Sequence, residues 1–426
     1  MARADNPVAE AAGHLLTSFK RPAHLMIAVS GGSDSTGLLV ALATLCATGR
    51  HPHITLSACT VDHGLRAGSG EEAAAVAALC ARHGIAHVIR RWQGAKPQAG
   101  LQAAARAKRY ALLRDAAVEM QADAILSAHT RDDQAETVAM RAARAADGIG
   151  LSGMAEAVLL DGAVWLLRPF LGIDREAIRS FLREKGEGWI DDPSNANPRF
   201  ERVRIRTRGD AATMPPTPGE RLLLAQRAAG FLLGNVRAEQ GLFVLAPPAL
   251  ETALADPAGW RGLLLLAATA GGRVHVLESR SAGRLRTFLA SGTLSRMTAG
   301  RVVFDRRRDA LYLYRECRDI APLILPARAT GVWDGRLRLA NGTRRTIIVS
   351  AAGQVAVEGL QGPVLRARHA APCLKFEDGA PVDAGAVDVV PMISPYARFL
   401  PRFDLPAAQA LAQLAGCPPF ASPPNE

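Results

Sequence analysis

The sequence predicts an α/β protein whose N-terminal half is built on a parallel sheet. Short apolar runs at residues 24–30, 53–62, 87–92 and 123–129 alternate with helical segments at 35–46, 70–83, 101–120 and 132–146. Strands that alternate with helices are typical of βαβ units. A Gly-Ser string follows the first run directly, as expected for a loop that enters a helix. Because ligands of such sheets bind beyond the carboxyl ends of the strands, loops 30–35, 62–66 and 129–133 are expected to meet.

A helix is expected over Asp174–Lys185, with Asp174 as its N-cap. Arg208–Gly219 carries three prolines and reads as a linker. A helix over Glu220–Gly241 and short β-like runs after about residue 325 follow. We therefore predict an N-terminal α/β domain over residues 1–208, a linker over 209–219, a mainly helical domain over 220–320 and a small α+β C-terminal domain over 321–426.

Composition excludes several classes of protein. The chain has 426 residues and a net charge of +11, which favours polyanionic partners, although the predominance of Arg over Lys also suits a GC-rich genome. Its six cysteines form no C-x-x-C pair, so neither a zinc site nor a disulfide framework is expected. No apolar run approaches the length of a membrane span. We expect a soluble cytoplasmic protein.

The string Ser30-Gly31-Gly32-Ser33-Asp34-Ser35 is the strongest motif. Glycines let the backbone approach an anion, and the following helix N-terminus favours negative charge. Asp34 would repel a phosphate unless a metal bridged them, and Mg²⁺ is the natural candidate. The alternative is an ordinary turn in which Asp34 caps the helix.

Three further motifs fall at the same edge or on one helix face. In the string 61–66, Arg66 could hold a phosphate and Asp62 a ribose or adenine amine, unless Asp62 only closes a turn. Arg106 and Arg109 share a helix face that is either solvated or turned towards ATP or RNA. His129, Asp132, Asp133 and Glu136 follow the fourth strand, where the helix dipole alone explains Asp132. Asp133 could share Mg²⁺ with Asp34 or bind a substrate amine.

The string SGGSDS after a strand resembles the PP-loop of the N-type ATP pyrophosphatases. Together with VDHGLR, AHTRDDQAET, LLRPFLGI and DDPSN before an Arg cluster, it resembles the tRNA(Ile)-lysidine synthetase family over residues 25–206. The resemblance implies a Rossmann-like, adenine nucleotide alpha hydrolase-like domain. It also implies that ATP adenylates carbon 2 of the wobble cytidine in CAU-anticodon tRNA(Ile), and that L-lysine then displaces AMP. The family's Arg cluster reads R-N-R-I-R, whereas Val203 replaces the Asn here.

The resemblance assigns roles to individual residues. Catalysis is expected from Asp34, Asp133 and Arg206, and Mg²⁺ at Asp34 and Asp133. ATP is expected at Ser30, Gly31, Gly32, Ser33, Asp34, Ser35, Asp62, Arg66 and His129. Lysine and tRNA are expected at Arg106, Arg109, Asp132, Asp133, Glu136, Arg202, Arg204 and Arg206.

Other interpretations stay open at the level of sequence. A tRNA thiolase is the main alternative, but cysteines are absent from the proposed site loops. A PP-loop synthetase for a small metabolite would not need the arginines of 280–308, which are either a tRNA surface or a solvated face. A non-catalytic RNA-binding protein would not need the intact acidic motifs. No residue stands out as the base for lysine attack, and no protein partner is predicted.

Overall fold

The computed structural model describes residues 6–65, 68–142, 152–191, 217–239, 241–354, 356–383 and 385–426. The chain forms two compact units, Met1–Pro218 with Ser422–Glu426, and Gly219–Ala421. In the first unit the elements are α1 Pro7–Ser18, β1 Ala23–Ala28, α2 Ser33–Ala47, β2 Ile54–Asp62, α3 Ser69–Arg82, β3 Ala86–Arg91, α4 Leu101–Glu119, β4 Ala124–Leu126, α5 Arg131–Ala142, β5 Ala157–Leu160, β6 Val164–Leu167 and α6 Arg175–Lys185.

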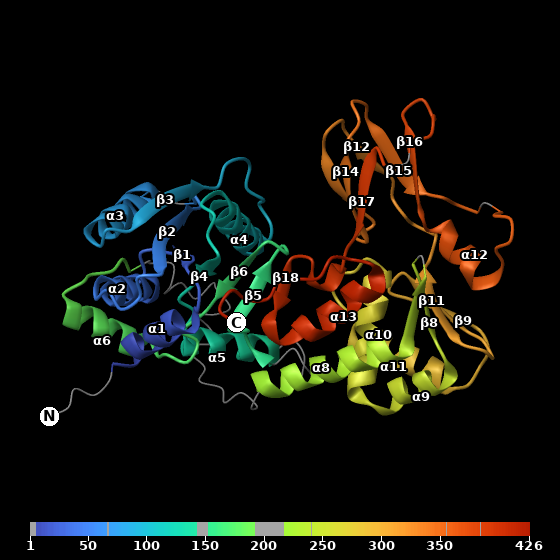
Figure 1. Ribbon diagram of the computed structural model, residues 1–426, viewed down its shortest axis with the longest axis horizontal. Coiled ribbons are helices and arrows are strands. Elements are labelled where there is room, and N and C mark those ends of the chain that lie inside the picture. The colour runs from blue at the N-terminus through green and yellow to red at the C-terminus, as the bar shows by residue number, and fades with distance from the viewer. Residues whose placement is uncertain are drawn as a thin grey trace. The chain divides into compact units, whose positions relative to one another are not determined.

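The strands of this unit follow the order β5-β6-β4-β1-β2-β3 (Figure 1). β1 runs parallel to β2 and β4, β2 to β3 and β4 to β6, while β5 is antiparallel to β6. The apolar run of β1 is buried along its length apart from His24, as expected for a strand covered on both faces. The parallel sheet predicted from the alternating pattern is thereby confirmed.

The strand order locates the ligand-binding edge. From β1 the chain moves outward through α2 to β2 and through α3 to β3, and it then returns through α4 to β4 on the other side of β1. Right-handed crossovers put α4 on the face opposite to α2 and α3. The order therefore reverses between β1 and β4, and ligands of open sheets bind at such a reversal.

The second unit contains more β-structure than the sequence predicted. Its elements are α8 Pro218–Asn235, β7 Val236–Glu239, β8 Leu242–Leu245, α9 Pro247–Ala255, α10 Pro257–Ala270, α11 Ser279–Ala290, β9 Arg296–Ala299, β10 Val302–Arg306, β11 Leu311–Arg315, β12 Leu323–Leu325, β13 Thr330–Trp333, β14 Leu337–Asn341, β15 Ile347–Ala351, α12 Gly362–His369, β16 Pro372–Phe376, β17 Val387–Pro391, β18 Phe399–Pro401 and α13 Leu405–Ala415. An antiparallel sheet β7-β8-β11-β10-β9 accompanies the helices of 220–320.

The helix expected over Glu220–Gly241 is wrong at its end. It stops at Asn235, and Val236–Glu239 instead pairs with β8 in an antiparallel hairpin. Further on, the sheets β12-β15-β16 and β13-β14-β17 enclose a core that includes Trp333, Leu339 and Ile347. The three-domain boundaries predicted above remain a prediction.

Candidate active site

The Gly-Ser string forms the loop between β1 and α2. Gly32 is the N-cap of α2, with extended backbone at φ −68° and ψ 160°. Gly31 has φ +86°, a region that L side chains rarely adopt. A Cβ added at Gly31 would lie 2.7 Å from Cδ1 of Ile190, so backbone and surroundings both require glycine here.

Hydroxyl groups fix the shape of this loop. The Ser30 amide donates to Ser35 Oγ at 3.1 Å, and Ser35 Oγ donates to the Gly32 carbonyl at 3.1 Å. Ser33 Oγ donates to Asp34 Oδ1 at 3.0 Å. Because the first amides of a helix have no intrahelical partner, the start of α2 offers donors and positive dipole to an anion. The loop therefore has the geometry of a phosphate-binding site.

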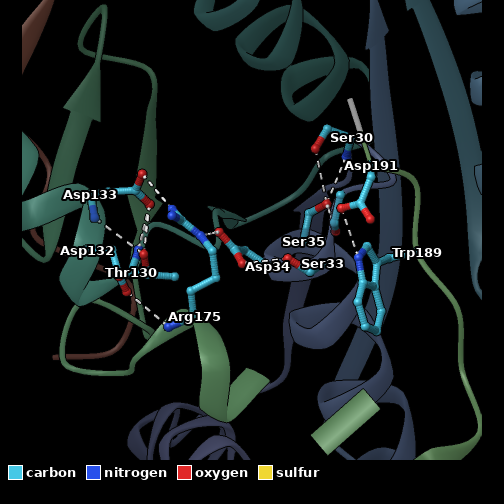
Figure 2. Close-up of polar contacts among 11 residues, drawn as sticks. Ser30, Ser33, Asp34, Ser35, Thr130, Asp132, Asp133, Arg175, Trp189 and Asp191 are labelled. Carbon is cyan, nitrogen blue, oxygen red and sulfur yellow. Dashed lines mark hydrogen bonds and ion pairs between the residues drawn. The ribbon is translucent and has the colours of Figure 1, made fainter. Parts of the chain in front are cut away.

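Two carboxylates from distant parts of the chain converge beside this loop. Asp133, in the first turn of α5, accepts from the amide and the hydroxyl of Thr130 at 2.9 and 3.1 Å through Oδ2. Its Oδ1 accepts from Arg175 Nη2 at 3.3 Å, and Asp34 Oδ2 accepts from Arg175 Nε at 3.0 Å. Figure 2 shows the guanidinium of Arg175 between the two carboxylates. The predicted pairing of Asp34 with Asp133 at one sheet edge thus has a basic residue at its centre.

Burial and the neighbouring charges act in opposite directions on the pKa values of Asp34 and Arg175. Burial raises the pKa of Asp34, and the charge of Arg175 opposes that effect without cancelling it. Burial acts to lower the pKa of Arg175, but Asp34 and Asp133 outweigh it and raise that pKa. Arg175 therefore stays protonated and favours the ionised form of its acidic neighbours.

The other predicted residues of the α5 edge have defined places. His129 Nδ1 and Ser127 Oγ are 2.9 Å apart. Asp132 is exposed, and its Oδ2 accepts from the backbone amide of Arg175 at 3.0 Å. Glu136 is 6% exposed and lies one turn along α5 from Asp133. This edge thus has one exposed, one half-buried and one buried carboxyl group.

Residues predicted on β2 and α4 lie in different settings. Asp62 is buried, and it accepts from the Gly64 amide at 2.8 Å and from Arg91 Nε at 3.0 Å, so it closes the turn after β2. Arg106 lies 5.1 Å above the ring of Tyr110. Arg109, half-buried on the same helix, acts together with burial to lower the pKa of His63. Arg66, Arg202, Arg204 and Arg206 lie outside the described residues.

Sequence reasoning missed two contributors to the site. The pattern around Arg175 predicts only a helix, although a cation in a first helical turn opposes the helix dipole and is itself a signal. Ile190 was also missed: its amide donates to the Gly31 carbonyl at 2.9 Å and its side chain covers Gly31. The segment before the DDPSN string therefore contacts the phosphate-binding loop directly.

Comparisons with known proteins agree with this geometry. A model of the PP-loop domain matches residues 5–209. A tRNA(Ile)-lysidine synthase of Rhizobium meliloti is 44% identical over 98% of this chain and 97% of its own length. The tRNA(Ile)-lysidine synthase of Mesorhizobium japonicum is 40% identical over 93% of both chains. That of Brucella anthropi is 38% identical over 79% of this chain and 78% of its own length.

The chain belongs to the tRNA(Ile)-lysidine synthase family. Membership confirms the resemblance inferred from the motifs. The PP-loop domain of the family implies the use of ATP. No helix in the described parts of the chain is long and apolar enough to cross a membrane.

The cysteines of this chain do not favour the sulfur chemistry of a tRNA thiolase. The U34-tRNA thiolase NcsA of Methanococcus maripaludis is a distant structural neighbour, with a TM-score of 0.40 and 17% identity over 47% of this chain and 70% of that one. Burial raises the pKa of Cys59 and Cys80 to about 11, which disfavours the thiolate. All six cysteines lie outside the loops that form the site.

The carboxylates of the site are compatible with Mg²⁺. No group of three or more His, Cys, Asp or Glu side chains within the described ranges is placed to hold a metal ion. Mg²⁺, however, is commonly held by one or two protein carboxylates together with phosphate oxygens and water. Asp34 and Asp133 supply such a pair beside the loop, so the donor set fits.

Proposed function

We propose that this protein joins L-lysine to carbon 2 of the wobble cytidine in CAU-anticodon tRNA(Ile), in the cytoplasm, with release of AMP and pyrophosphate. The observation that carries the proposal is the phosphate-binding loop facing Asp133 across one sheet edge. This arrangement occurs in a chain that matches a lysidine synthase over 98% of its length. The site thus combines a nucleotide cradle with acidic groups suited to a cationic second substrate.

In the adenylation step the loop would bind the phosphates of ATP. Ser30 is exposed at the loop, and the start of α2 supplies backbone donors. Attack of the cytidine carbonyl oxygen on the α-phosphate transfers AMP and breaks the bond to pyrophosphate. Donors already held in place stabilise the charge that develops without reorganisation, which is the main source of catalysis at such sites. Asp34 and Asp133 would hold Mg²⁺, which would neutralise charge on the phosphates.

In the second step lysine would displace AMP from the tRNA. Its side-chain amine attacks carbon 2, and the carbon–oxygen bond to AMP breaks. The amine must lose a proton to become a nucleophile. Asp132, exposed on the first turn of α5, would attract the lysine ammonium, and Asp133 or Glu136 would orient it or accept its proton.

Basic side chains outside the cluster would hold the tRNA. Arg106 and Arg109 on α4, and the arginines at 202, 204 and 206, are proposed for this role, the last also for catalysis. In the second unit, Arg286 is engaged with the Leu254 carbonyl at 2.6 Å and Arg307 with Asp305 at 3.3 Å. The exposed Arg280 and Arg308 are therefore the better candidates for phosphate contacts, followed by exposed Arg284, whose Nη2 donates to Ser281 Oγ at 3.4 Å.

The test is transfer of radiolabelled lysine to tRNA in the presence of ATP and Mg²⁺. We expect label on isoleucine tRNA with a CAU anticodon and none on methionine tRNA with the same anticodon. Asp34→Ala should abolish the label, while Asp378→Ala, which removes an exposed carboxylate 2.6 Å from Arg345 in the second unit, should leave it. Pyrophosphate release with a different acceptor and no lysine transfer would overturn the substrate assignment.

A further inference from the structure

Arg175 is held in place by three acidic residues from two helices of the first unit, α2 and α5. Its Nε contacts Asp34 at 3.0 Å and its Nη2 contacts Asp133 at 3.3 Å. Its backbone amide donates to Asp132 at 3.0 Å. The side chains of Arg175, Asp34 and Asp133 are 18%, 21% and 18% exposed, so the contacts are largely shielded yet open to a ligand.

The position of Arg175 is unfavourable for the helix that carries it. It is the first residue of α6, where the dipole disfavours a cation. The N-cap residue Asp174 makes no side-chain capping bond and instead pairs with Arg131. The side chains that contact Arg175, rather than α6 itself, therefore account for a guanidinium at this point.

We propose that Arg175 is a positioning residue that competes with a divalent cation for Asp34 and Asp133, so that the cation binds weakly to the ATP-free protein and enters together with ATP. The inference rests on the proposed function, because it takes these two carboxylates as the metal pair. The guanidinium contacts both of them in Figure 2, and it takes the place of a cation that would bridge them.

Charge explains why Arg175 would leave Asp34 and Asp133 when a divalent cation binds them. A divalent cation and a guanidinium repel each other at the distance that shared carboxylates impose, so the two do not occupy the pair together. Bound ATP places several phosphate oxygens beside the same loop, and a guanidinium binds phosphate as readily as carboxylate through its planar set of donors. The phosphates thus offer Arg175 a new partner as the cation takes Asp34 and Asp133.

Mn²⁺ provides the probe, with free Mn²⁺ measured by electron paramagnetic resonance. The full-length wild type is compared with Arg175→Gln, without nucleotide and with ATP whose α–β bridge is a methylene group. We expect Arg175→Gln to bind Mn²⁺ alone at least about tenfold more tightly, because it retains a polar side chain but removes the competing charge. The nucleotide should strengthen Mn²⁺ binding in the wild type more than in the variant.

Two further variants separate the possible causes. Arg183→Gln changes the same residue type on α6 in an exposed pair with Glu176 and should match the wild type. Arg175→Lys keeps the charge and should stay within about threefold of the wild type. Unchanged or weaker Mn²⁺ binding by Arg175→Gln, or an equal gain in Arg175→Lys, would overturn the proposal. If, in the presence of the nucleotide, Asp34→Asn bound Mn²⁺ as tightly as the wild type does, the assignment of Asp34 and Asp133 as the metal ligands would be wrong.

Discussion

Substitution of Gly31 by alanine tests whether the phosphate-binding loop depends on its local geometry. Gly31 has φ +86°, and a left-handed backbone costs an alanine about 1–2 kcal/mol. The new Cβ would also lie 2.7 Å from Ile190 Cδ1 and 3.1 Å from Val76 Cγ2, an overpacking that costs about 1–3 kcal/mol. The sum, about 2–5 kcal/mol, is a large part of the stability of a domain.

Thermal unfolding and ATP binding by calorimetry measure this effect. We expect Gly31→Ala to lower the Tm of the first unit by roughly 4–20 °C and to weaken ATP binding, because the loop must shift. Gly32→Ala is the matched control for stability, since Gly32 has φ −68° and its added Cβ would lie 3.8 Å from the nearest neighbour, Ser30 Oγ. Equal Tm values for Gly31→Ala and Gly32→Ala would refute the reasoning.

Three further changes have expected outcomes. Gly37→Ala should destabilise the first unit despite the better helix propensity of alanine, because the added Cβ would lie 2.3 Å from Ile178 Cγ2. The double variant Gly37→Ala/Ile178→Ala should lose less free energy of unfolding than the sum of the two single variants, as a double-mutant cycle in urea would show. Cys59 should resist iodoacetamide at pH 8 in the native protein and react faster as the pH rises towards its pKa of about 11, as followed by mass spectrometry. Asp404→Ala should destabilise the second unit by about 3–5 kcal/mol in urea unfolding, because it removes the buried carboxylate that lies 2.9 Å from Arg221 and 3.7 Å from Arg261.

Each of these measurements has a control within the chain. Gly13→Ala, on α1, adds a Cβ with no heavy atom within 4 Å and should not destabilise; if Gly37→Ala behaves in the same way, the packing argument is wrong. Half-buried Cys317 should be alkylated before Cys59, and the reverse order would contradict the role of burial. Asp378→Ala removes an exposed ion pair and should cost less than about 1 kcal/mol; an equal loss in Asp404→Ala would show that burial adds nothing.

The N-terminal fold could be predicted because its signals are local. Each strand of the parallel sheet is a short apolar run, and each following helix begins near a glycine or an acidic turn, as at Gly32 and Glu71. The hairpin at Val236–Glu239 could not be predicted in this way. Its pairing with β8 overrides the helical pattern that precedes it, and pairing depends on a partner strand rather than on the segment alone.

In the site, too, local sequence signals could be predicted but contacts between distant segments could not. The carboxyl ends of β1 and β4 brought Asp34 and Asp133 together because parallel strands share their ligand-binding edge. Arg175 joins them from a position 141 residues beyond Asp34, and no local pattern encodes that contact. Asp62 illustrates the opposite case: its spacing to Gly64 already allowed a closed turn, and its buried side chain accepts that amide. Its predicted contact with the nucleotide stays a prediction.

The close approach of α2 and α6 at Gly37 and Ile178 also bears on how the sequence can evolve. A larger side chain at position 37 has no room while Ile178 stays in place, since its Cβ would lie 2.3 Å from a fully buried methyl group. A smaller side chain at position 178 that lacks this methyl group removes the clash and leaves a cavity in its place. The two positions are thus epistatic, and the accessible mutational path is directional: position 178 must shrink before position 37 can grow.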